Sequence, residues 1–384
     1  MIPIAGLIAA AVLLLVLVAP VAIDALANRR GRPDLASVPP AARALHDRLW
    51  IADLHADSLL WHRHLLVEHR RGHVDLPRLV RGNVALQVFT VVSKVPFGLN
   101  FESNAATSDM ITPLAVLQRW PAATWFSLYA RAQHQARRLH GFAAASDGRL
   151  AVVTTARDVE ALAARRGRGE RVVGGLLGIE GAQVLEGELT RLEALFDAGF
   201  RLLGLTHFFD TDVAGSAHGV AKGGLTPLGR QVVPRMEQLG MIVDLAHASS
   251  ATIDDVTALA TRPVLVSHTG VAGTRASPRN LTDAQLDRVA ATGGLIGITY
   301  FPQAVGGKDV GAIVRAVRHT VDRVGVTHVA LGSDFDGAVR TPFDAAGLPV
   351  LTDALLTGGF GDEDIAAIMG ENVQRFLLAT LPRG

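Results

Sequence analysis

The sequence has no cysteine among its 384 residues. A disulfide framework, a thiolate metal site and a cysteine nucleophile are therefore all excluded. Any metal ion must be held by histidine, aspartate or glutamate. The absence of cysteine does not by itself decide the cellular compartment.

An excess of charge of one sign is also missing. The 37 Lys and Arg residues are balanced by 36 Asp and Glu residues, which leaves a formal net charge of +1. Nucleic-acid-binding proteins usually carry a basic excess or stripe, so we expect no nucleic-acid partner. Hydrophobic residues make up 49% of the chain and charged residues 19%, a composition that favours a folded protein over a disordered one.

The first segment of the chain differs from the rest. Residues 1–23 contain no charged side chain, Asp24 ends the run, and Arg29, Arg30 and Arg32 follow. Such a run reaches the roughly 20 residues that a membrane helix needs, so we predict an N-terminal membrane helix within residues 1–30, a single span that anchors the protein.

A cleaved signal peptide is the alternative, because Ala25-Leu26-Ala27 has the small-x-small form of a cleavage site. The arginines after the span place the main domain in the cytoplasm by the positive-inside rule, whereas a signal peptide would export it, so the side of the membrane stays open. Residues 31–45 contain Pro33, Pro39 and Pro40 and are predicted to be a linker. Residues 46–384 are predicted to form the catalytic domain.

Eight short runs rich in Val, Ile and Leu recur along this domain, separated by polar or helix-like stretches. Runs that are apolar on both faces are typical of strands buried in a parallel sheet. Eight such strands alternating with helices predict an α/β fold, a (β/α)8 TIM-like barrel. The runs are Ile51–His55, Val84–Phe89, Val172–Glu180, Arg201–His207, Met241–His247, Pro263–His268, Gly294–Tyr300 and His328–Asp334.

Six of these eight runs end in or just before a His, Glu or Asp. Barrel enzymes place their active sites at the carboxyl ends of the strands, and a packed barrel has no need for such residues there. We therefore expect these side chains to converge on one face of the barrel. They are His55, Asp57, Glu180, His207, His247, His268 and Asp334.

The types and spacing of these residues favour a metal site. His55 and Asp57 lie two positions apart, so their side chains point the same way along a strand. Glu180 has two oxygens and is suited to bridging two cations, and His247 and His268 are available for the second. Nitrogen and oxygen ligands without sulfur fit zinc, manganese or cobalt. Two such ions generate a hydroxide nucleophile and polarise a carbonyl or phosphoryl oxygen, which is typical of hydrolysis.

An ordered set of short motifs from about Ile51 to Phe376 resembles the zinc membrane dipeptidases, the renal dipeptidase-like family. The motifs are DLHADSL around His55, GHVDLPRL at Gly72–Leu79, GIEGA around Glu180, LTHFFDT around His207, LGMIVDLAHAS around His247, PVLVSHTG around His268, SPRNLTD around Arg279 and GSDFDG around Asp334.

The resemblance implies a role for each of these residues. It makes His55, Asp57 and Glu180 ligands of one Zn²⁺, and Glu180, His247 and His268 ligands of a second. It implies that His207 contacts the scissile group of the substrate, that Arg279 holds the terminal carboxylate, and that Asp334 moves the proton. We also expect Asn280 and Tyr300 to contribute to the substrate pocket.

The resemblance further implies the activity, hydrolysis of dipeptides with a free C-terminal carboxylate, D-residues included at that position. Family members typically form dimers, so a homodimer is a further expectation. Two other classes of function stay open on the residues alone. One is a different binuclear barrel hydrolase acting on a lactone, an N-acyl amino acid or a phosphoester. The other is a non-catalytic, membrane-tethered binding protein.

Overall fold

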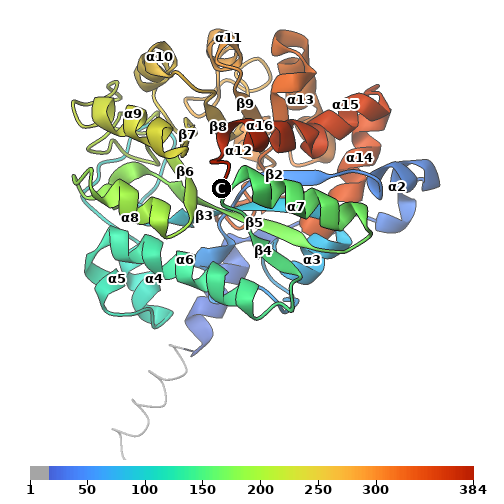
Figure 1. Cartoon of the computed structure of the whole chain (residues 1–384), viewed down its shortest axis with the longest axis horizontal. Coiled ribbons are helices and arrows are strands. Elements are labelled where there is room, and N and C mark those ends of the chain that lie inside the picture. The colour runs from blue at the N-terminus through green and yellow to red at the C-terminus, as the bar shows by residue number, and fades with distance from the viewer. Residues whose placement is uncertain (1–16) are drawn as a thin grey trace, which may run out of the picture.

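The computed structural model describes residues 17–384. Its main sheet is a closed barrel of eight parallel strands, because β3 pairs with β5 and completes the ring. All eight predicted strands are present, and helices surround them (Figure 1), so the predicted TIM-like barrel is confirmed. The barrel strands are β2 Ile51–Ala56, β3 Val84–Val92, β5 Val173–Glu180, β6 Phe200–Gly204, β7 Ile242–Asp244, β8 Leu265–Thr269, β9 Leu295–Ile298 and β10 Val329–Leu331.

Three short strands and a series of helices complete the described part of the chain. Strand β4 (Leu150–Val152) lies beside β5, and β1 (Arg29–Arg30) pairs with β11 (Arg340–Thr341). The α-helices are α2 Pro40–His46, α3 Leu76–Arg81, α4 Ile111–Leu117, α5 Ala123–Phe126, α6 Leu128–Ala144, α7 Ala156–Gly167, α8 Arg191–Asp197, α9 Gly229–Leu239, α10 Ser250–Leu259, α11 Asp283–Ala291, α12 Pro302–Val305, α13 Val310–Val324, α14 Leu348–Thr357, α15 Asp362–Ala366 and α16 Asn372–Thr380.

The strands and helices form where the sequence chemistry favours them. Barrel strands are buried along their whole length, as their continuous apolar runs predict. Ser249 caps the backbone of α10 and Thr282 that of α11, where the side chain of Gln285 completes a capping box. Helices between the strands therefore begin at defined residues and leave the strand ends free to carry the site.

The predicted membrane segment lies mostly outside the described residues, since these begin at residue 17. Within residues 17–384, no helix combines the length and the apolar character that crossing a bilayer requires. Residues 17–27 are helical. The membrane helix thus stays a prediction.

Residues 31–45, predicted as a linker from their prolines, contain ordered structure. A 3-10 turn covers Leu35–Ser37, and α2 begins at Pro40 and buries Ala42 and Leu45. Proline is tolerated in the first turn of a helix because the backbone N–H it lacks has no partner there anyway. Pro39 and Pro40 therefore start a helix that packs on the barrel domain.

The end of the N-terminal helix is fixed to the barrel by a buried ion network, which the sequence analysis did not foresee. The Asp24 carboxylate lies 2.7 Å from Nε of Arg71 and 3.1 Å from Nε of Arg63. Arg63 in turn lies 2.8 Å from the Asp336 carboxylate. Burial opposes ionisation of Asp336, but the Arg63 charge and the hydrogen bonds from His73 and Ser58 outweigh it and hold the pKa of Asp336 far below its usual range.

We expect Arg63→Ala to destabilise the protein by about 3–5 kcal/mol, because it leaves the Asp24 and Asp336 carboxylates buried without their shared cation. Urea unfolding of the full chain measures the change. Arg81→Ala is the matched control: its ion pair with Glu68 is about half exposed and should contribute about 1 kcal/mol or less. Equal losses of unfolding free energy in the two variants would show that the buried network stabilises the protein no more than an exposed ion pair does.

Candidate functional site

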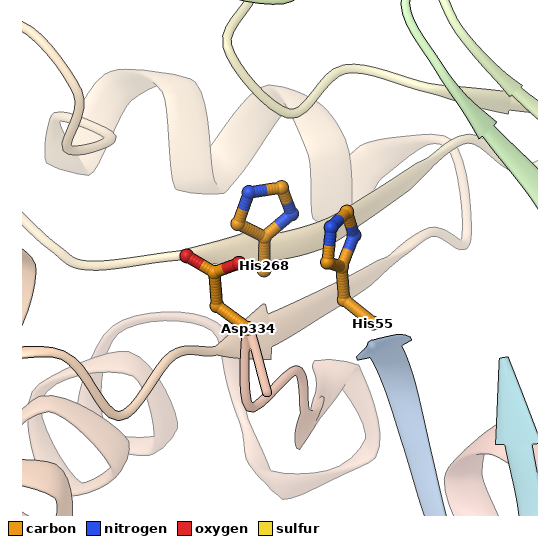
Figure 2. A group of neighbouring side chains, drawn as sticks. All are labelled: His55, His268 and Asp334. Atoms are coloured by element: carbon orange, nitrogen blue, oxygen red, sulfur yellow. The ribbon is translucent and has the colours of Figure 1, made fainter. Parts of the chain in front are cut away.

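The predicted site residues converge at the carboxyl ends of the barrel strands. His55 lies in β2, Glu180 ends β5, and His268 lies in β8. Asp57 directly follows β2, and the other three predicted residues stand three positions beyond a strand, His207 after β6, His247 after β7 and Asp334 after β10. Figure 2 shows His55, His268 and Asp334 approaching one another from two strands and the loop after a third.

Two of these residues have an unusual backbone conformation. His247 and Asp334 both have a φ of 61°, in the left-handed region that few residues other than glycine adopt. Such a conformation costs on the order of 1–3 kcal/mol and persists where surrounding contacts enforce it, often at functional sites. The chain turns sharply just after each strand and aims both side chains into the centre of the site.

The Glu180 carboxylate lies at the centre of four imidazole rings. Its Oε1 atom is 3.2 Å from Nε2 of His247 and 3.6 Å from Nε2 of both His55 and His268. Its Oε2 atom is 3.2 Å from Nε2 of His207. The Nε2 atoms of His247 and His268 are 3.0 Å apart, and Nε2 of His55 is 3.5 Å from the Asp57 carboxylate. One carboxylate therefore faces both predicted sets of ligands.

These separations fit a metal centre. Two atoms bound at roughly 2.0–2.2 Å to one tetrahedral cation lie about 3.4 Å apart. Nε2 of His55 is buried without a hydrogen-bond partner in the described part of the chain, as expected of a nitrogen that faces a cation. His55, Asp57 and Glu180 form one group with metal-ligand spacing, Glu180, His207 and His247 a second, and His55, His268 and Asp334 a third.

A buried network behind the site orients the imidazole rings. Ser267 donates its only hydroxyl proton to Asp244 at 2.6 Å, so its oxygen can only accept hydrogen bonds. That oxygen lies 3.2 Å from Nδ1 of His55 and 3.0 Å from Nδ1 of His268. Both rings therefore carry their proton on Nδ1 and turn the Nε2 lone pair toward Glu180, the arrangement typical of metal-binding histidines. Thr90 similarly donates to Asp57 at 2.6 Å.

Sequence reasoning missed this supporting network. Ser267 stands directly before His268, and Asp244 stands three positions before His247. Their closeness in sequence to a predicted ligand is the signal that was available. Nothing in the residue types alone distinguished them from ordinary strand residues.

Burial shapes the charges of the site. Burial, together with the repulsion of Asp57, raises the pKa of Glu180 well above its usual range. Burial, helped by the charge of Arg279, lowers the pKa of His247 well below its usual range. Burial, helped by the charge of His55, does the same to the pKa of His268. Burial likewise raises the pKa of Asp334 to about 7, although the His55 charge opposes it. At His55 burial is outweighed by the charges of Asp57 and Glu180, which raise the pKa to about 10. A divalent cation binds neutral imidazoles and ionised carboxylates, so metal binding here releases the protons that these groups hold without it.

The predicted substrate residues other than His207 differ in where they lie. Arg279 is buried, donates a hydrogen bond to the His268 carbonyl, and has an Nε atom without a partner among the described residues. Asn280 donates to the carbonyls of Arg275 and Ala304 at 2.7 and 2.8 Å, so it holds its own loop in place. Tyr300 packs in the core against Phe335 and Phe343, whereas its neighbour Phe301 lines a cavity.

Two cavities lie at the site, and His247 lines both of them. The larger, of about 500 Å³, is lined by Asp57, Glu180, His207, His247 and Asp334 together with an apolar wall. The smaller, of about 410 Å³, is lined by Arg279, Asn280, His247 and Lys222. The five ligand candidates and Asp334 are buried, and the larger cavity gives a substrate access to Asp57, Glu180, His247 and Asp334.

A parallel barrel with a buried His, Asp and Glu cluster at its strand ends defines the class of metal-dependent barrel enzymes. The family model of the membrane dipeptidases, peptidase family M19, matches residues 40–380. The chain belongs to this family, so the resemblance seen in the motifs and the prediction of a hydrolase of the dipeptidase type are confirmed.

Individual relatives agree with this assignment. Dipeptidase verJ of Clonostachys rogersoniana is 31% identical over 315 residues, which cover 80% of this chain and 76% of the relative. The crystal structure of dipeptidase AC, a metallopeptidase of family M19, has a TM-score of 0.69 at 27% identity and covers 87% of this chain and 99% of its own. A Rhodobacter sphaeroides metallopeptidase, solved with a phosphinate mimic of the dipeptide L-Ala-D-Ala, has a TM-score of 0.69 at 26% identity, with 86% and 99% covered.

Proposed function

We propose that the protein hydrolyses the peptide bond of dipeptides that carry a free C-terminal carboxylate, with two Zn²⁺ ions held by His55, Asp57, Glu180, His247 and His268. The observation that carries the proposal is the single Glu180 carboxylate, which lies 3.2 to 3.6 Å from imidazole nitrogens of both ligand sets. Bound cations of this kind supply an activated water and polarise the scissile carbonyl.

The residues of the chain divide the remaining work. Asp334 lines the larger cavity beside His55 and His268, where its carboxylate oxygen accepts a proton from water and delivers it to the leaving amine. His207 lines the same cavity with its Nε2 atom 3.2 Å from Glu180, and this position supports a role in orienting the scissile group. Burial of the whole set excludes bulk water from the reacting atoms.

Arg279 is proposed to bind the carboxylate of the substrate. A guanidinium presents a planar fork that pairs with a carboxylate through two hydrogen bonds. Arg279 is buried beside the site, and its Nε atom has no hydrogen-bond partner among the described residues. A D-residue at this end is part of the proposal, and the relative solved with a mimic of L-Ala-D-Ala supports it.

Metal analysis and a substrate panel test the function together. The full chain should carry two metals, lose activity with a chelator, and cleave L,L- and L,D-dipeptides but not lactones or phosphotriesters. Cleavage of a lactone or phosphotriester in preference to every dipeptide would replace this proposal with the other class of binuclear hydrolase.

We expect Arg279→Ala to lower kcat/KM for dipeptides about 10- to 150-fold, because a hydrogen bond to a charged group contributes roughly 1.5–3 kcal/mol. The same variant should lose little on a C-terminally amidated dipeptide, a poor substrate that never makes this contact. Steady-state kinetics on the matched pair measures both. Equal losses on the two substrates would make Arg279 structural.

Membrane attachment and a homodimer also remain proposals. The apolar residues 1–23 are proposed to anchor the protein, with cleavage after Ala27 and export as the alternative. Such cleavage would separate Asp24 from Asn28, although both contact the barrel. The intact mass of protein recovered from the membrane fraction distinguishes the two, and its size in solution tests the dimer.

A further inference from the structure

The larger cavity combines a charged floor with an apolar wall. The floor includes Asp57, Glu180, His207, His247 and Asp334, whereas the wall consists of aliphatic and aromatic side chains. An apolar wall beside a peptide-cleaving centre favours substrates that place an apolar side chain against it. The side chains of the wall include Leu60, Trp61, Val95, Phe97, Ile111 and Leu114.

Two further residues of the wall come from the N-terminal helix, Ile23 and Ala27. Ala27 packs against the buried cluster that contains Trp61 and Leu114. The family match begins only at residue 40, so this part of the wall lies outside the region that the family model describes.

Neighbouring contacts fix the position of this helix end. Asp24 pairs with Arg63 and Arg71, and the Asn28 side chain accepts a hydrogen bond from the Ala338 backbone at 3.0 Å. Strand β1 then pairs with β11. Ile23 precedes Asp24 and Ala27 precedes Asn28, so the contacts of Asp24 and Asn28 hold both residues in place. The part of the wall that they form therefore has a fixed position beside the site.

The proposed role of Arg279 sets the direction in which a dipeptide lies. Arg279 lines the smaller cavity, and His247 lines both. A substrate whose carboxylate pairs with Arg279 therefore places its amino-terminal residue across the metal ligands, in the larger cavity. The side chain of that residue faces the apolar wall.

We propose that Ile23 and Ala27 form part of an apolar subsite that selects dipeptides with a large apolar amino-terminal side chain. This inference rests on the proposed function. It makes the segment before the family domain a determinant of substrate specificity.

Ala27→Trp in the full chain tests the subsite, because a large side chain at position 27 occupies the space of the substrate side chain. Leu-D-Ala and Gly-D-Ala share one carboxyl end and differ only at the subsite. The wild type should prefer Leu-D-Ala by about 10-fold or more in kcat/KM, the range expected for burying a leucine side chain. The variant should lose about 10-fold or more on Leu-D-Ala and change little on Gly-D-Ala.

Leu26→Trp is the matched control, since Leu26 is the neighbour of Ala27, is 63% exposed and does not belong to the wall.

Ile23→Asp is the second variant. Ile23 is 38% exposed, so the fold tolerates a charge there, and the variant should also lower the preference for Leu-D-Ala over Gly-D-Ala. Equal losses on both dipeptides, or Leu26→Trp matching Ala27→Trp, overturn the subsite. Wild-type protein that cleaves neither these two dipeptides nor their L-Ala counterparts would instead overturn the proposed function, before any variant is made.

Discussion

Glu180→Gln should remove most of the activity and at least one of the two bound metals. The Glu180 carboxylate faces Nε2 of His55, His247 and His268 at 3.2 to 3.6 Å, so it is the one group that both ligand sets share. A neutral amide offers one oxygen instead of two and no charge, which leaves two cations repelling each other at close range. Loss of even a supporting contact behind a metal costs about 10- to 100-fold in affinity, so loss of the bridge should exceed that.

Metal content after dialysis and kcat on the best dipeptide are the two measurements. Glutamine has nearly the shape of glutamate, so the barrel should fold normally, which an unchanged thermal unfolding midpoint would verify. Glu188→Gln is the control, because Glu188 is exposed and, within residues 17–384, forms an ion pair with Arg191 alone. A Glu180→Gln protein with two metals and full activity would remove the basis of the binuclear proposal.

The barrel and the cluster of ligands were predictable because both depend on local patterns. Each barrel strand is a short apolar run, and its residue types alone determine that it is buried. The site residues follow at the ends of those runs, where topology brings them together without further information. His207, His247 and Asp334 were found in this way although each lies three residues beyond its strand.

The position of the N-terminal helix end was not predictable from the same kind of pattern. Asp24 follows a long apolar run and reads as the end of a membrane span. Its partner Arg63 is distant in sequence, and the Asp336 that Arg63 also contacts is far more distant. The spacing of apolar residues predicts which face of a segment is apolar, but it does not identify the distant charged residue that the segment contacts. The same limit applies to Tyr300, a strand-end residue whose side chain the structure places in the core.

Asp334→Asn is expected to lower kcat about 100- to 10,000-fold, the range that general acid–base groups contribute, while two metals stay bound. The asparagine amide cannot accept and return the proton that the proposed reaction moves from water to the leaving amine. Asparagine also tolerates the left-handed backbone that position 334 adopts at a φ of 61°. The loop should therefore keep its shape, and KM should change much less than kcat.

The competing interpretation is that Asp334 is itself a metal ligand, since its carboxylate lies in one group with His55 and His268. Metal content separates the two interpretations, because a ligand variant loses metal whereas a proton-transfer variant keeps it. Asp336→Asn gives the contrast from the same loop: Asp336 has a φ of 65° and pairs with Arg63, so that variant should lose stability. An Asp334→Asn protein that retains both metals, unfolds at the wild-type midpoint and turns over slowly would assign Asp334 to proton transfer. A metal-depleted protein would make it a ligand.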